Sequence, residues 1–131
     1  MSSQYTWHMP PNPNRFEFQR AVEDCQRVCE GLSTLENSVE LGGWDGDKEP
    51  LFTPVIICFN GKGPDQSHQT FQVRLDGNGP NSCNTFSLRY DLAVRCCLLI
   101  LQKHLKGFTY SGGPASPSWE LSRAMNEKFL R

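Results

Sequence analysis

The sequence has no apolar run long enough to cross a membrane. Its most apolar stretch lies around Leu98–Leu101 and is interrupted by Arg95 and Gln102, whereas a spanning helix needs about 20 mainly apolar residues. The N-terminal residues show no basic start followed by an apolar stretch, and residues 10–13 contain three prolines, which is not typical of a secretory signal. We therefore expect a soluble, cytoplasmic protein with no membrane partner.

An excess of charge of one sign is also missing. The chain has 13 Lys and Arg residues against 14 Asp and Glu residues, which gives a net charge of −1. In the C-terminal segment, Arg123 and Lys128 alternate with Glu120 and Glu127. A nucleic-acid surface needs clustered positive charge, so we expect no nucleic-acid partner.

Cysteine is not scarce, but its positions do not fit a disulfide framework. Cys25 and Cys29 lie one helical turn apart on an apolar face, Cys58 lies in an apolar strand, and Cys96 and Cys97 are adjacent in an apolar helix. Cys25 and Cys29 could reach one metal ion, but zinc ligands usually sit in pairs near turns. Reduced thiols packed as small hydrophobic groups are the better interpretation, and we expect no metal and no cofactor.

The apolar pattern predicts three helices. The first begins at Asn14, which forms a capping box with Glu17, or alternatively at Asn12–Pro13, and it ends at Gly31. The second begins between Ser87 and Tyr90 and ends near Lys106. The third begins with Ser116 as its cap and Pro117 in its first turn, and it ends near Leu130.

Alternating or continuous apolar residues predict the strands. They are Leu35–Leu41, Leu51–Phe59, Thr70–Leu75 and a short strand at Phe108–Ser111. We therefore expect a two-layer α+β fold, in which an antiparallel sheet of three or four strands packs against the first two helices and the third, C-terminal helix lies at the margin. Residues 1–12 are expected to form a flexible N-terminal arm, and residues 13–131 a single domain.

Several loop residues could carry chemistry. Cys83 is the one cysteine in a polar loop, and His68 is the one histidine in a central loop, but the sequence does not show that they meet. Asp45 and Glu49 precede the strand Leu51–Phe59, whereas Asp65 and His68 follow it. A strand of about nine residues spans roughly 30 Å, so we expect these two groups at opposite ends of the sheet.

Other residues are typical of ligand contacts. The loop from Asn60 to Pro64 follows a strand and contains Lys62, although its glycines lack the spacing of a phosphate-binding loop. Trp44 and Trp119 lie beside turns, where aromatic side chains can anchor a ligand or close the core.

The chain also contains a string of short motifs. They are Gly42-Gly43-Trp44-Asp45-Gly46, Phe59-Asn60-Gly61, His68-x-Thr70-Phe71, Tyr90-Asp91 and Lys103-His104. This string resembles small uncharacterised bacterial or phage proteins, and the resemblance implies no activity. It directs attention to Asp45, Asn60, His68, Tyr90 and Asp91.

Two functions follow from these observations. The first is a non-catalytic binding or protein-interaction module, with a protein partner or a second copy of itself, whose binding candidates are Trp44, Asn60, Lys62 and Trp119. The second is a small hydrolase or transferase with a loop site near His68, Tyr90 and Asp91. We favour the first, because no nucleophile, base and orienting group can be assembled from the sequence.

Overall fold

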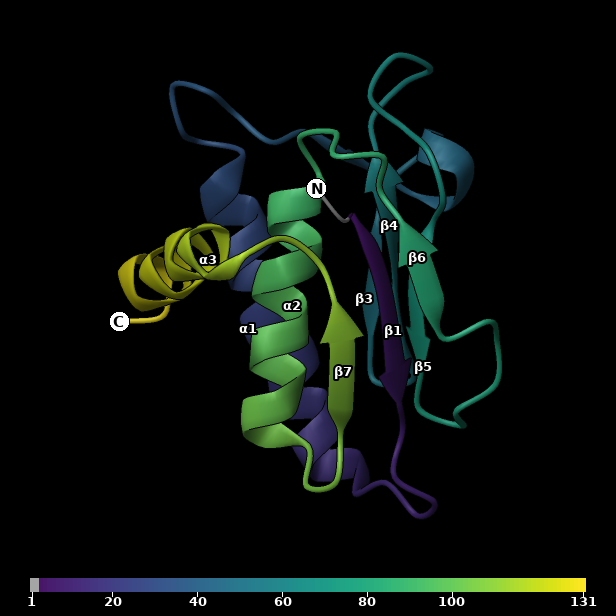
Figure 1. Ribbon diagram of the computed structural model, residues 1–131. Coiled ribbons are helices and arrows are strands. Elements are labelled where there is room, and N and C mark those ends of the chain that lie inside the picture. Colours follow the sequence, from purple (N-terminus) through teal and green to yellow (C-terminus); the bar gives the residue numbers. More distant parts are fainter. Residues whose placement is uncertain (1–2) are drawn as a thin grey trace.

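The computed structural model describes residues 3–131 and confirms the predicted α+β fold. Figure 1 shows three helices gathered on one side of the molecule and the strands on the other. The strands form two antiparallel sheets, one of three strands and one of four. Both sheets and all three helices contribute to one hydrophobic core.

The three helices lie where the apolar periodicity places them. They are α1 (Arg15–Leu32), α2 (Asp91–His104) and α3 (Ser116–Phe129). Asn14 caps α1, since its side-chain oxygen accepts two backbone N–H groups of the first turn at 2.9 and 3.0 Å. Helix α2 packs against both α1 and α3, which explains why its middle is apolar on almost every side.

The four-stranded sheet is built around β4. Its strands are β2 (Leu41–Gly42), β3 (Leu51–Thr53), β4 (Ile56–Gly61) and β5 (Phe71–Arg74). Both β2 and β3 pair with one side of β4, and β5 pairs with the other. Residues 43–50 therefore bulge out between two segments of one edge, and they include the short turn η1 (Trp44–Gly46).

The prediction of one strand over Leu51–Phe59 is wrong. The chain reverses at Pro54 and Val55, so that β3 and β4 form a hairpin. Proline fixes the backbone for a turn, and the Thr53 hydroxyl accepts the N–H groups of Val55 and Ile56 at 3.3 and 3.2 Å. The predicted strand at Leu35–Leu41 is also wrong, because only Leu41 lies in a strand and the residues after α1 form turns.

The three-stranded sheet corrects the prediction of a flexible arm at residues 1–12. Its order is β6 (Ser82–Asn84), β1 (Gln4–His8) and β7 (Thr109–Gly112), with β1 in the centre. Tyr5 is 0% exposed and Trp7 is 1% exposed. The prolines after β1 end the strand rather than keep it out of the fold. Met1 and Ser2, the start of that predicted arm, lie outside the described residues.

The cysteines are all buried. This confirms the burial expected of Cys25, Cys29, Cys58, Cys96 and Cys97, and no disulfide joins any of the six. The remaining one, Cys83, is not in an exposed loop as its polar neighbours suggest but in β6, with its side chain in the core. Figure 1 shows β6 beside β1.

We predict that Trp7→Ala lowers the free energy of unfolding by about 3–5 kcal/mol, as deletion of a buried aromatic side chain does. His8→Ala is the matched control, because His8 is exposed on the same strand, and its effect should stay below about 0.5 kcal/mol. Urea unfolding measures both. Equal and small effects would show that this segment does not pack in the core.

Candidate functional site

Three loops meet at the end of β4, and two of them, residues 43–50 and 62–70, were expected at opposite ends of the sheet. The hairpin at Pro54 brings residues 43–50 back beside residues 62–70. The Asp45 N–H donates to the Thr70 hydroxyl at 3.0 Å, and the Gly63 N–H donates to the Gly46 carbonyl at 3.2 Å. The predicted separation is wrong because it assumed one continuous strand.

The third loop, residues 84–90, joins the same end. The Gln69 N–H donates to the Asn84 carbonyl at 3.3 Å, and the Asn84 N–H donates to the Gln69 side-chain oxygen at 2.7 Å. These reciprocal bonds tie the loop before α2 to the loop before β5.

Asn60 organises these loops. It is 0% exposed, and its Nδ2 donates to the His68 carbonyl and the Thr70 hydroxyl, each at 3.0 Å. Its Oδ1 accepts the N–H groups of Gly61 and His68 at 2.8 and 3.0 Å. An amide side chain offers two donors and two lone pairs, so Asn60 has no hydrogen-bonding capacity left for a ligand.

His68 lies on the surface of this loop cluster. Its Nδ1 is 2.8 Å from the Asn84 carbonyl oxygen, which can only accept, so Nδ1 carries the proton. The ring stacks on Phe86 with centroids 5.3 Å apart. Phe86 is 69% exposed and, like Ser87, has a positive φ that is unusual for a residue with a side chain.

Tyr90 is committed to the fold. Its side chain is buried, and its hydroxyl donates to the Gln69 carbonyl at 2.6 Å. Burial raises the Tyr90 pKa above its ordinary value. The hydroxyl therefore stays protonated near neutral pH, and its proton is used by the Gln69 carbonyl.

Asp91 is at the centre of a buried polar network. Its Oδ1 accepts the hydroxyls of Tyr5 and Thr85 at 2.7 and 2.5 Å, and its Oδ2 accepts Arg95 Nε at 2.9 Å. Arg95 Nη1 donates to the Ser122 hydroxyl at 2.9 Å and to the Ser118 carbonyl. The carboxylate thus joins β1 and α2, and through Arg95 it reaches α3.

The structure therefore does not bring His68, Tyr90 and Asp91 into one site. The His68 ring is exposed, and the Tyr90 hydroxyl is used by a loop carbonyl. The Asp91 carboxylate is used by β1 and α2. Within residues 3–131, no hydrogen bond links these three side chains.

Cys83 and His68 do not form a catalytic pair either. The Cys83 thiol donates to the Gln69 carbonyl at 3.4 Å. Burial raises the pKa of Cys83 from 9.0 to about 12, so the nucleophilic thiolate is scarce near neutral pH.

The two tryptophans predicted as aromatic anchors, Trp44 and Trp119, differ in their exposure to solvent. Trp119 is 8% exposed, its Nε1 donates to the Pro114 carbonyl at 3.1 Å, and its ring packs edge-on against Tyr5. It closes the core and is not presented to a ligand. Trp44 is 60% exposed on the insertion of residues 43–50 and lines an open hollow beside Asp45.

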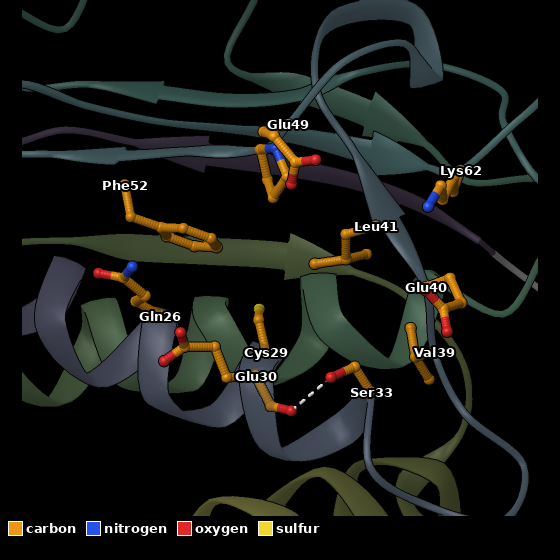
Figure 2. A pocket seen from close by; sticks show the side chains of 11 residues that line it. Gln26, Cys29, Glu30, Ser33, Val39, Glu40, Leu41, Glu49, Phe52 and Lys62 are labelled. Atoms are coloured by element: carbon orange, nitrogen blue, oxygen red, sulfur yellow. Dashed lines mark hydrogen bonds between the residues drawn. The ribbon is translucent and has the colours of Figure 1, made fainter.

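A cavity of about 310 Å³ lies between α1 and the edge of the four-stranded sheet. Figure 2 shows Cys29, Leu41 and Phe52 between the helix and the strands, where with Val39 they form an apolar floor. Lys62, one of the predicted binding residues, lies at the strand side of this cavity.

Three carboxylates from separate segments surround that floor. Glu30 comes from α1, Glu40 precedes β2, and Glu49 ends the insertion before β3. Among the described residues, none of the three forms an ion pair, nor does Lys62. The hydrogen bond drawn in Figure 2 joins the Ser33 hydroxyl to the backbone carbonyl of Glu30 at 2.6 Å, and it does not use that residue's carboxylate. The cavity therefore carries net negative charge.

Lys62 and Glu49, which the sequence singled out, both line this cavity, but the sequence did not single out Glu30 and Glu40. Glu30 has the position of a water-facing residue on the first helix, and Glu40 belongs to a predicted strand that does not form. Their convergence depends on how α1 packs against β3, and no local pattern reports that packing.

The described residues limit other chemistries. No three His, Cys, Asp or Glu side chains within residues 3–131 are placed to hold one metal ion. None of the described helices is long and apolar enough to cross a membrane. Comparison with protein-family models, with curated proteins and with solved structures found no match for the chain.

We predict that Asp91→Asn lowers the free energy of unfolding by about 3–5 kcal/mol, because it leaves the Arg95 charge buried without its partner. Asp76→Asn is the matched control. Asp76 forms an exposed pair with Arg74, in which both side chains are more than 40% exposed, so its loss should hardly move the urea midpoint. Similar shifts in the two variants would contradict a buried role for Asp91.

We also predict that stability falls as the pH rises above about 9. Because the pKa of Cys83 is higher in the folded protein, the unfolded chain loses this proton first. The contribution is fully present below pH 9 and is lost toward pH 12, at up to about 1.4 kcal/mol per pH unit. Urea midpoints between pH 8 and 11 measure the slope, which should be shallower in Cys83→Ala. An unchanged slope would contradict the assignment to Cys83.

Proposed function

We propose that the protein is a non-catalytic binding module, and that the cavity between α1 and the β2–β3 edge receives a cationic side chain of a protein partner. One observation carries this proposal: Glu30, Glu40 and Glu49 surround an apolar floor and have no ion-pair partner among the described residues. Three segments of the chain supply the carboxylates, so the fold and not one local charge run creates the site.

The floor and the rim suit the two parts of a lysine or arginine side chain. Such a side chain has an apolar stem and a charged end. The stem would pack on Leu41 and Phe52, which are half-buried. The aromatic face of Phe52 also favours a nearby cation, and the carboxylates would meet the charged end.

The size of the cavity agrees with one inserted side chain. Sites for whole small molecules usually occupy about 300–1,000 Å³, and this cavity is at the lower end with about 310 Å³. Lys62 at the rim disfavours a ligand with positive charge on every side. The positive charge of Lys62 is compatible with a cationic partner residue whose neighbours are acidic or neutral.

A binding role also agrees with the positions of the residues that were considered for catalysis. His68, Tyr90 and Asp91 do not converge, and Tyr90 and Asp91 are occupied within the fold. A cytoplasmic location remains part of the proposal. Six unbridged, buried thiols agree with a reducing compartment.

We predict that a blocked Gly-Arg-Gly peptide shifts the NMR signals of Leu41 and Phe52, whereas the same peptide with citrulline, the neutral isostere of arginine, does not. Glu49→Gln should weaken binding about two- to fivefold, as expected for one partly exposed charge. A triple change of Glu30, Glu40 and Glu49 to Gln should abolish it.

Glu23→Gln is the matched control, because Glu23 is exposed on α1 but does not line the cavity. It should leave the affinity unchanged. Equal binding of the arginine and citrulline peptides, or equal effects of Glu23→Gln and Glu49→Gln, would refute the proposal.

A further inference from the structure

A second cavity, of about 250 Å³, lies between the start of α2 and the start of α3. It shares no lining residue with the carboxylate-lined cavity, and its lining carries the opposite net charge. Leu88, Leu92, Pro114 and Leu121 form its apolar walls. Its polar lining includes Arg89, Asp91 and Arg95.

Arg95 gives this cavity a buried charged donor. The residue is 8% exposed, and its Nε and Nη1 are used by Asp91, Ser118 and Ser122. Within residues 3–131 no hydrogen bond uses its third nitrogen, Nη2, and this atom is not one of the buried polar atoms that lack a partner, so solvent reaches it. A carboxylate in the cavity would replace the solvent at Nη2 and accept a charge-assisted hydrogen bond from it.

The charges of the lining select the kind of acceptor. Arg89 and Arg95 bring two positive charges and Asp91 brings one negative charge, so the wall carries one net positive charge. This balance suits a monoanion. A phosphate dianion would face the Asp91 carboxylate with an uncompensated charge, which is destabilising in a partly buried site.

The walls and the volume define the rest of the ligand. A cavity of this size holds roughly eight waters at about 30 Å³ each, so the ligand has few non-hydrogen atoms. Four aliphatic residues around it favour a branched apolar body. We infer that this cavity binds a carboxylate with a short branched aliphatic group, either as a free acid or as the C-terminal leucine of a peptide.

Arg95 and Arg89 act differently on that carboxylate. Arg95 donates through a nitrogen whose position is fixed by three protein contacts, which pre-organises the site. Arg89 is exposed at the rim and adds attraction through solvent. The Asp91 network described above thus positions a binding donor in addition to joining the elements of the fold.

The test is an NMR titration of the Arg95 Nε–H signal and of the Leu88 and Leu121 methyl signals. Isovalerate and acetyl-Gly-Gly-Leu with a free carboxylate are the two probes, which distinguish a free acid from a peptide end. Isovaleramide and the peptide amide are their neutral controls. We expect saturable shifts with at least one acid and none with the amides.

Arg89→Gln should weaken binding about two- to fivefold, and Arg95→Lys should weaken it about tenfold or more, since Lys lacks the fork that carries Nη2. Arg123→Gln is the matched control, because Arg123 is exposed on α3 and does not line this cavity. If Arg95→Lys does not fold, Arg89→Gln and the amide controls still decide the question. The inference would be overturned if the shifts did not saturate or if the amides bound as well as the acids. It would also be overturned if inorganic phosphate bound more tightly, or if Arg89→Gln and Arg123→Gln had equal effects.

Discussion

The Asp91 carboxylate is the interaction on which the arrangement of helices and sheets depends. It accepts hydrogen bonds from β1 and from the turn before α2, and its bond to Arg95 extends to α3. A buried ion pair adds little net stability compared with apolar packing, but removing one partner is costly. The network therefore acts mainly to specify one geometry, in which β1 and α3 are both fixed against the start of α2.

Close backbone approach is the second constraint, and it shapes the loops beside the carboxylate-lined cavity. A Cβ at Gly61 would lie 1.6 Å from the Gln66 carbonyl oxygen, and one at Gly42 would lie 2.5 Å from the Gly46 oxygen. Neither glycine has a positive φ, so space and not backbone conformation demands glycine there. The Gly42 contact lets residues 43–50 fold back on β2, and the Gly61 contact lets the loop of residues 62–70 approach β4.

Local patterns were sufficient for the helices but not for the sheets. Helix α1 is defined by its own periodicity and by Asn14, which caps it within the same segment. Strand pairing joins distant segments, so no local signal places β1 between β6 and β7. The turn at Pro54 was visible as a proline, but the apolar residues on both sides of it favoured one continuous strand.

The same reasoning explains why the sites were hard to predict. Asn60, Tyr90 and Asp91 stood out as polar residues near apolar segments, and each is now explained by hydrogen bonds within the fold. Glu30, Glu40 and Arg89 are exposed charged residues of common surface types, and only the packing of distant segments brings them to the two cavities. The resemblance to small bacterial or phage proteins stays a prediction.

The central position of β1 also has a consequence for biosynthesis. Its partners, β6 and β7, lie far along the chain, and contacts between distant segments form slowly because closing a long loop costs entropy. At a synthesis rate of about 5–20 residues per second, Gln4–His8 would leave the ribosome several seconds before β7 exists. During that time the aromatic side chains of Tyr5 and Trp7 are without their burial sites. A nascent chain of this kind would be a substrate for ribosome-associated chaperones, which bind exposed apolar segments until the sheet can close.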